Sequence, residues 1–180
     1  MKPKVVLITG APGVGKSAVA SILLERLPES IWLDGDDVWR MNPFRVNGTT
    51  TAMVESNIQF VLRNFLSAGF AYVILSWVLH RQAIIDRILE GLAGLEYEPF
   101  LFTLVCEEEA LKARLEDDPS RQGVTELALR RLRESRELET RKIDVTRRGT
   151  EEIVEEILRE IAGEGDKGTN EAIRDGKGDR

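Results

Sequence analysis

The chain lacks most of the features that mark an extracellular or membrane protein. Cys106 is the only cysteine among 180 residues, so no disulfide can form within the chain. No apolar run approaches the roughly 18 residues that a membrane-spanning helix needs. The opening stretch "MKPKVVLITG" holds too short an apolar run for a secretory signal. We therefore expect a protein of a reducing compartment, the cytoplasm, with no membrane partner.

The chain also lacks an excess of positive charge. The chain has 25 lysines and arginines against 31 acidic residues, which gives a formal net charge of −6. This balance disfavours nucleic acid and anionic membrane surfaces as main partners. A small anionic ligand stays compatible, because backbone amides and a few arginines can make one site locally positive. The hydrophobic share of 42% is that of an ordinary globular domain.

Strand and helix patterns alternate along the chain. Apolar runs predict strands at 4–8, 30–34, 71–77, 99–106 and 142–145. Helical spacing of apolar residues predicts helices at 16–27, 50–68, 81–92, 107–117 and 125–142, and a last helix through 161 with Thr150 as its N-cap. Most strands are apolar on both faces. The sequence therefore predicts an α/β fold: a parallel sheet with helices on both faces.

The composition changes towards the end of the chain. Residues 1–162 carry the alternating pattern, whereas 163–180 have almost no large apolar residues. We expect this last stretch to be a disordered tail. Within the domain, the polar stretch "DDPSRQG" falls in 117–124 and has the proline and glycine of a lid.

The most specific motif lies between the first strand and the first helix. Gly10, four residues, then Gly15, Lys16 and Ser17 fit the spacing of a phosphate-binding P-loop. Glycines let backbone N–H groups surround phosphate oxygens, the lysine reaches the β- and γ-phosphates, and the serine hydroxyl binds Mg²⁺. The predicted ATP-binding residues are Gly10, Pro12, Gly13, Val14, Gly15, Lys16, Ser17 and Ala18, together with Arg114 and Arg121.

A second group of candidate residues follows the second strand, in "LDGDDVW". Ligands of parallel sheets bind beyond the carboxyl ends of strands, so these aspartates should lie near the P-loop. We expect Asp36 to be the catalytic base or the residue that orients the acceptor hydroxyl. The candidate acceptor-binding residues are Asp34, Asp36, Trp39, Asn42, Arg45 and Trp77.

The third strand ends in a serine where P-loop proteins commonly carry an acid that helps to hold Mg²⁺. Ser76 occupies that place. Another acid must then help Ser17 with the metal, or water must do so. An aspartate of the 34–37 group is the natural substitute, and we assign this role provisionally to Asp36.

Two arginines flank the lid segment. Arg114 and Arg121 are candidates for stabilising the charge of a transferring phosphate. Four further arginines of the 125–142 helix are expected on its solvated face, paired with Glu134, Glu137 and Glu139. His80, the only histidine, is assigned a structural or surface role in preference to substrate contact. We expect Cys106 to be a small buried apolar residue.

These motifs together resemble the small P-loop kinases of the nucleoside-monophosphate-kinase-like group, which includes gluconate kinase, shikimate kinase, adenylylsulfate kinase and chloramphenicol phosphotransferase. The resemblance covers residues 4–162 and depends on "LITGAPGVGKS", "LDGDD", "LKARLEDDPSR" and "KIDVTRRGTEEIVEEIL". It implies a three-layer P-loop fold with strand order 2-3-1-4-5. It also implies adenine contact by 146–150 and lid-flanking roles for Arg114 and Arg121.

The sequence thus predicts a cytoplasmic phosphotransferase, monomeric or homodimeric, that uses ATP and Mg²⁺ to phosphorylate a hydroxyl of a small polar molecule. The catalytic residues would be Lys16, Asp36 and Arg121. The acceptor stays open: it could resemble gluconate or an antibiotic. Two other interpretations also stay open, namely a nucleoside or nucleotide kinase and a nucleotide-binding regulatory module with slow ATPase activity.

Overall fold

The computed structural model describes residues 2–118 and 125–163. Arg121, the centre of the predicted lid and the tail from residue 164 lie outside the described residues. No helix in the described ranges is both long and apolar enough to cross a membrane.

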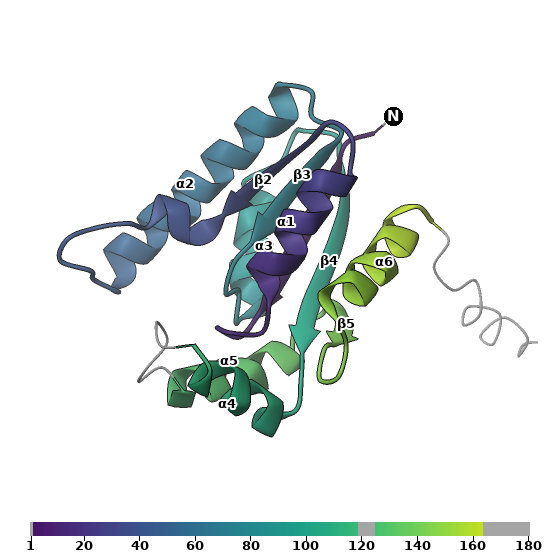
Figure 1. Cartoon of the computed structure of the whole chain (residues 1–180). Helices are drawn as coiled ribbons and strands as arrows, with labels where there is room; N and C mark the ends of the chain where they lie inside the picture. The colour runs from purple at the N-terminus through teal and green to yellow at the C-terminus, as the bar shows by residue number, and fades with distance from the viewer. Residues whose placement is uncertain (1, 119–124, 164–180) are drawn as a thin grey trace, which may run out of the picture.

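One five-stranded parallel sheet forms the middle of the molecule, in the order β2-β3-β1-β4-β5 (Figure 1). The strands are β1 (Lys4–Gly10), β2 (Ser30–Asp34), β3 (Tyr72–Ser76), β4 (Glu98–Val105) and β5 (Arg141–Asp144). The predicted order and direction are confirmed, and each strand lies within two residues of its expected bounds. β1 stands in the middle, so the loop that follows it emerges at the centre of the sheet edge.

Helices cover both faces of this sheet. They are α1 (Lys16–Arg26), α2 (Gly48–Ser67), α3 (Gln82–Glu90), α4 (Glu108–Glu116), α5 (Thr125–Arg136) and α6 (Thr150–Ile161), and a short 3-10 helix η1 spans Gly35–Val38. α1 contacts α6, and α2 contacts α3. Figure 1 shows α4 and α5 grouped beyond the carboxyl end of β4.

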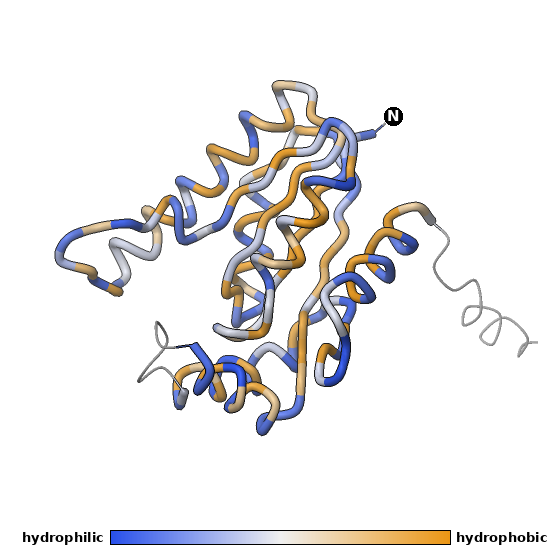
Figure 2. The backbone as a smooth tube through the Cα atoms, viewed as in Figure 1, coloured by the Kyte–Doolittle hydropathy of each residue, from blue (hydrophilic) through white to orange (hydrophobic). Residues whose placement is uncertain are grey.

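Alternation along β1 divides the core into two clusters. Val6 and Ile8 pack with α1 and α6 on one face, whereas Val5 and Leu7 pack with α2 and α3 on the other. All four side chains are fully buried, as expected for a central parallel strand. The hydropathy colours in Figure 2 follow this arrangement, with apolar residues concentrated in the strands and along one side of each covering helix.

The fifth helix is shorter than predicted. The expected helix 125–142 ends at Arg136, and β5 begins at Arg141. The reason is tertiary packing: Leu132 belongs to the cluster around α1, but Leu138 is buried in the cluster around α2. A continuing helix would not carry both side chains to opposite faces of the sheet. The Lys142 ammonium donates to the Leu138 carbonyl in the turn.

The predicted N-cap of the last helix is also wrong. Thr150 is the first helical residue of α6, and Gly149 in an extended conformation stands at the cap without a side-chain hydrogen bond. By contrast, Asn47 caps α2 through a reciprocal capping box with Thr50. The beginning of α2 is thereby fixed two residues before the expected start.

Candidate active site

The phosphate-binding loop has the geometry that its glycines predict. Gly10, Gly13 and Gly15 all have positive φ angles, of 142°, 82° and 108°. At Gly13 a Cβ atom would also lie 2.7 Å from a methyl carbon of Leu115, so the loop fits closely under α4. The chain then enters α1 at Lys16. Backbone N–H groups at such a helix start favour an anion.

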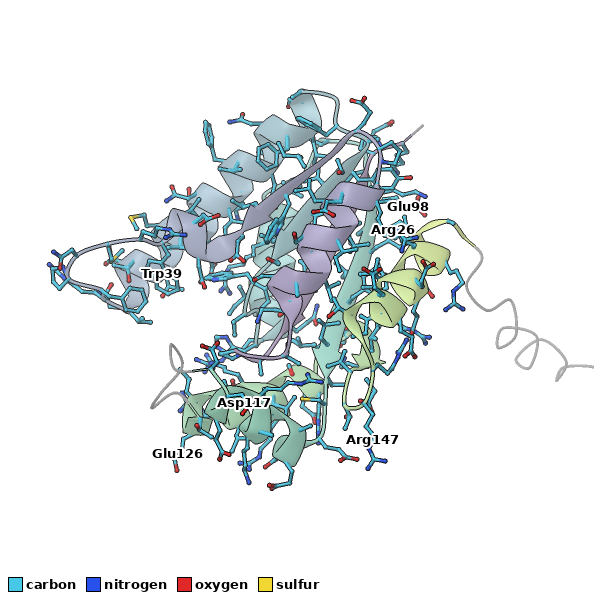
Figure 3. The ribbon with its side chains drawn as sticks, viewed as in Figure 1. Arg26, Trp39, Glu98, Asp117, Glu126 and Arg147 are labelled. Atoms are coloured by element: carbon cyan, nitrogen blue, oxygen red, sulfur yellow. The ribbon has the colours of Figure 1, made fainter. Side chains whose placement is uncertain are left out.

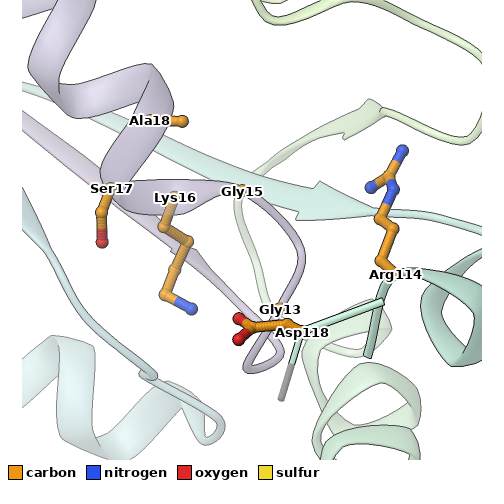
Figure 4. A pocket seen from close by; sticks show the side chains of 7 residues that line it. All are labelled: Gly13, Gly15, Lys16, Ser17, Ala18, Arg114 and Asp118. Atoms are coloured by element: carbon orange, nitrogen blue, oxygen red, sulfur yellow. The ribbon is translucent and has the colours of Figure 1, made fainter. Parts of the chain in front are cut away.

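A cavity of about 240 Å³ opens at this loop. It is lined by Gly13, Gly15, Lys16, Ser17, Ala18, Arg114 and Asp118. Figure 4 shows the Lys16 and Ser17 side chains leaving the beginning of α1 along one wall, with Asp118 beside Gly13. The Lys16 ammonium donates to the Ala11 carbonyl at 2.9 Å. The structure therefore brings most of the predicted ATP-binding residues to one cavity.

A second cavity, of about 290 Å³, also adjoins the loop. Its lining is shared between the P-loop, α1, Arg114 and the chain from Val145 into α6: Gly13, Val14, Gly15, Val19, Arg114, Val145, Arg148, Gly149, Thr150 and Ile153. Gly13, Gly15 and Arg114 line both cavities. Together the two cavities offer a polar end and an end with apolar side chains, which suits a nucleotide.

Arg114 joins the elements around these cavities. Its guanidinium donates to the Val145 carbonyl at 2.5 Å and more weakly, at 3.4 Å, to the Val14 carbonyl. The following turn is organised by Asp144, whose carboxylate accepts from the amide and hydroxyl of Thr146. These bonds hold the pKa of Asp144 below its ordinary value.

The carboxylate of Asp34 connects the P-loop helix to the sheet. One oxygen, Oδ2, accepts from the Ser17 hydroxyl at 2.9 Å and from the Ser76 hydroxyl at 3.1 Å. The other, Oδ1, accepts from the Asp36 amide at 3.1 Å and caps η1. Of the three aspartates, Asp34 is the one that contacts Ser17. The assignment of the metal role to Asp36 therefore has less geometric support than an assignment to Asp34.

Asp36 is held by an aromatic residue instead. The Trp77 indole N–H donates to Asp36 Oδ1 at 3.1 Å. Trp77 packs edge-on against Trp39, with ring centroids 5.8 Å apart. The ring centroids of Trp39 and Phe44 are 5.5 Å apart. Gly35 makes this packing possible, because a Cβ there would lie 2.3 Å from the Trp77 ring.

The segment after η1 is exposed. Figure 3 shows Trp39 on the segment that leaves β2 and projects beyond the sheet towards α2. Asn42 and Arg45 are exposed there, and 64% of the Phe44 surface is accessible. Among described residues, Trp39 Nε1 is the buried side-chain polar atom without a hydrogen-bond partner. Acceptor contact by this segment stays a prediction.

The arginines of α5 are placed differently from the prediction. Arg131 pairs with Glu134 of its own helix, as expected. Arg133 instead makes a bidentate pair with Glu108 of α4, and Arg136 donates to the carbonyl of Cys106. These contacts fasten α5 to the end of β4. Cys106 is 2% exposed, and burial raises the pKa of its thiol, in agreement with an inert apolar role.

His80 is half-buried in the connection between β3 and α3. Burial and the nearby Arg131 lower the pKa of its imidazole.

Sequence reasoning missed Asp118 and Arg148 as lining residues. Arg148 could have been found from the sequence, because it lies in the stretch 146–150 that was expected near adenine. Its ion pairs with Glu152 and Glu156 could not, because they depend on how the chain folds into α6.

Ser17, which lines the first cavity, and its partner Asp34 have the donor chemistry of a magnesium site. In the described ranges no group of three or more His, Cys, Asp or Glu residues could hold a metal. Mg²⁺ does not need one, because it commonly keeps waters and phosphate oxygens beside one or two protein ligands. A serine hydroxyl and a carboxylate 2.9 Å apart at the P-loop supply that donor set.

Comparison with known proteins agrees with this architecture. A family model described as AAA domain matches residues 6–142. A sequence comparison with curated proteins finds no match. A gluconokinase from Sinorhizobium meliloti is similar in structure, with a TM-score of 0.69, 20% identity, and coverage of 89% of this chain and 93% of that one.

Two further solved structures are similar over nearly their whole length. The tunicamycin resistance protein of Deinococcus radiodurans has a TM-score of 0.66 and 24% identity, covering 89% of this chain and 96% of that chain. The APS kinase of Mycobacterium tuberculosis, in complex with AMPPNP and APS, has a TM-score of 0.64 and 18% identity, covering 89% and 98%. Gluconokinase and APS kinase are two of the types that the sequence resembles. With the P-loop, the sheet order and the match over most of its length, the chain belongs to the AAA domain family and has the P-loop NTPase fold.

Proposed function

We propose that the protein is a phosphotransferase that moves the γ-phosphate of ATP to a hydroxyl group of a small polar molecule, in the cytoplasm. The observation that carries this proposal is the Ser17–Asp34 hydrogen bond of 2.9 Å. It joins the phosphate-binding loop directly to the segment that holds Asp36 and the aromatic residues. A phosphate site and an acceptor site at this segment would therefore be adjacent, as transfer between them requires.

The P-loop would bind the nucleotide. Its amides and the Lys16 ammonium line the first cavity and would hold the β- and γ-phosphates, and the second cavity, between Val145 and Ile153, would accept the nucleoside. Arg114 lines both cavities and brings a positive charge to their junction. Arg121 is proposed as a second arginine for the transferring group, by sequence position alone.

Ser17 and Asp34 would hold Mg²⁺ from the protein side. When bound, the ion would neutralise negative charge on the transferring phosphate. Asp34 accepts the Ser17 proton, so a lone pair of the serine oxygen is left for the metal. We therefore propose Asp34, in preference to Asp36, as the acid that substitutes for the one missing at Ser76.

Asp36 would take the proton of the acceptor. As the acceptor oxygen bonds to the γ-phosphorus, the bond from that phosphorus to the bridging oxygen of ADP breaks and the hydroxyl proton passes to the Asp36 carboxylate. Trp77 binds Oδ1 of that carboxylate, which fixes its orientation and leaves Oδ2 for the substrate.

The aromatic residues favour an acceptor with an apolar face. Trp77, which bonds Asp36, packs against the half-buried Trp39, and Trp39 packs against the exposed Phe44. Aromatic rings contribute binding energy with little loss of side-chain entropy. A hydroxyl directed at Asp36 and a ring or carbon chain against these side chains would fit. Both sugar-like and antibiotic-like molecules have this combination.

A panel of acceptors tests the proposal. Sugars, sugar acids, hydroxylated antibiotics, nucleosides and nucleoside monophosphates would each be supplied with MgATP, and ADP release would be measured. We expect slow basal release and a strong increase with one acceptor class, together with a phosphorylated product. An increase with nucleosides or nucleotides would instead support a nucleotide kinase. Tight nucleotide binding without any acceptor-dependent release would support a regulatory module.

A further inference from the structure

A chain of four side chains lies at the carboxyl edge of β2 and β3. The Trp32 indole N–H donates to Ser76 Oγ at 3.0 Å, Ser76 donates to Asp34 Oδ2 at 3.1 Å, and Ser17 donates to the same oxygen at 2.9 Å. Trp32 is only a donor and a carboxylate is only an acceptor. The single proton of Ser76 is therefore directed at Asp34, and its lone pair is directed at Trp32.

Sheet register places these residues together. Asp34 and Ser76 are Cα partners in the parallel β2–β3 pair, and Trp32 precedes Asp34 by two residues, so it lies on the same face. Trp32 packs against the core cluster beneath α1, and α1 begins with the P-loop lysine and Ser17. The chain thus runs on the face of the sheet that carries the phosphate-binding helix.

Ser76 stands where P-loop proteins commonly carry an acid, and its buried hydroxyl is fully used in hydrogen bonds. It is 1% exposed, and its hydroxyl makes both of the hydrogen bonds described above. A buried hydroxyl in contact with a carboxylate stabilises that carboxylate in one orientation, because hydrogen bonds to charged groups are stronger than neutral ones.

We propose that Ser76 is a positioning residue that holds the Asp34 carboxylate on Ser17, and that Trp32 fixes Ser76 in turn. The acid that would support Mg²⁺ is thereby moved one strand outward, from β3 to β2, and the serine left on β3 orients it. This inference depends on the proposed function, since it concerns Mg²⁺ and nucleotide at the P-loop. It does not depend on the identity of the acceptor.

The first experiment measures nucleotide binding and not turnover. The dissociation constant of AMPPNP would be measured by calorimetry with Mg²⁺ and with EDTA, in the full-length protein and in Ser76→Ala. We expect the affinity in EDTA to change by less than about twofold, and the Mg²⁺-dependent gain in affinity to fall about tenfold, as for loss of a hydrogen bond to a charged group.

A matched control separates positioning from stability. Thr103 is also a fully buried strand hydroxyl, bonded to Thr140 on the far side of the sheet. Thr103→Val should lower the melting temperature and leave the Mg²⁺-dependent gain unchanged. If Ser76→Ala behaves like Thr103→Val, with stability lost and Mg²⁺ dependence intact, Ser76 is merely structural and the inference is wrong.

Exchanging the two side chains gives a sharper test. Asp34 and Ser76 are paired across neighbouring strands, about 4.8 Å apart. The double variant Asp34→Ser with Ser76→Asp keeps one carboxylate and one hydroxyl at this position. We expect each single variant to lose most of the Mg²⁺-dependent gain and the double variant to recover part of it. No recovery in a folded double variant would overturn a shared role.

Trp32 provides an optical signature that a structural serine would not give. The sequence has three tryptophans, so replacing Trp39 and Trp77 by phenylalanine leaves Trp32 as the single tryptophan. Adding Mg²⁺ to the AMPPNP complex should shift its emission, and Ser76→Ala should abolish the shift. If the unaltered protein binds no AMPPNP, both the proposed function and this inference fail. If it binds with full Mg²⁺ dependence in every variant, the inference alone fails.

Discussion

The phosphate-binding loop and the segment 34–47 are built by different means. The loop between β1 and α1 is made by backbone, with three glycines at positive φ and close packing under α4. The segment after β2 depends on side chains, namely Asp36, Trp39 and Phe44, and from Asn42 to Gly48 it is exposed. A backbone site recognises what every nucleotide shares. Under the proposed function, the side chains of the exposed segment would decide which acceptor is used.

Asp34 connects the two regions. Its carboxylate accepts hydrogen bonds from the Ser17 hydroxyl at the phosphate-binding loop and from the amide of Asp36, the proposed base. We therefore expect some substitutions to change nucleotide binding and others to change transfer to the acceptor. Substitutions of Asp34 and Ser76 should change both. The predictions below test this division, from the largest expected effect to the smallest.

Loss of the P-loop lysine should have the largest effect. Lys16→Ala removes the ammonium that faces the phosphate cavity, and we expect turnover to fall by about 10³-fold while the melting temperature hardly changes. Acceptor-dependent ADP release and thermal unfolding measure the two quantities. Lys112→Ala is the control, because Lys112 pairs on the surface with Glu109. Normal turnover in a folded Lys16→Ala protein would contradict the phosphate site.

Loss of the proposed base should affect transfer and spare nucleotide binding. Asp36→Asn keeps an oxygen for the Trp77 indole but cannot take a proton, so we expect transfer to fall about 100-fold. AMPPNP affinity should stay the same. Asp37→Asn is the matched control, since Asp37 pairs with Arg40. If Asp36→Asn instead loses affinity only with Mg²⁺, Asp36 belongs to the metal site.

A methyl group at Gly35 should disturb the acceptor side alone. Its Cβ would meet the Trp77 ring at 2.3 Å, so the ring must shift and Asp36 loses its fixed orientation. We expect kcat/KM for the acceptor to fall about tenfold, with little change in nucleotide affinity. Gly48→Ala provides the comparison, because a Cβ there meets nothing within 4 Å. Equal kinetics for both variants would show that Trp77 does not orient Asp36.

The smallest effect concerns pH. Burial and Arg131 lower the pKa of His80 in the folded protein. As the pH falls, His80 is therefore protonated in the unfolded chain at a higher pH than in the folded protein. The free energy of unfolding is highest above the ordinary histidine pKa of about 6.5 and decreases as the pH falls below that value. His80→Gln should flatten this dependence of the melting temperature between pH 7 and 5. An unchanged slope would mean that other groups dominate.

Local sequence was sufficient wherever the determinant is contiguous. The P-loop needs eight successive residues with a strand before and a helix after, and all of these are visible in the sequence. The alternation of strands and helices along the chain likewise predicted the parallel sheet, because strands that are buried on both faces are continuous apolar runs. Helix ends were predicted less well, and α5 is the example: Leu138 packs on the opposite face from Leu132, which no helical periodicity reveals.

The partners within the site were decided by tertiary structure. The sequence placed Asp34, Asp36 and Asp37 together and favoured Asp36 for the metal role, but in the structure Asp34 is the aspartate that contacts Ser17, because neighbouring residues point in different directions. Register with β3 put Ser76 beside Asp34, and the start of α1 put Ser17 there too. Spacing along the chain determined that a phosphate would be bound. Only the pairing of strands, which joins residues 42 positions apart, decided which acid would stand beside it.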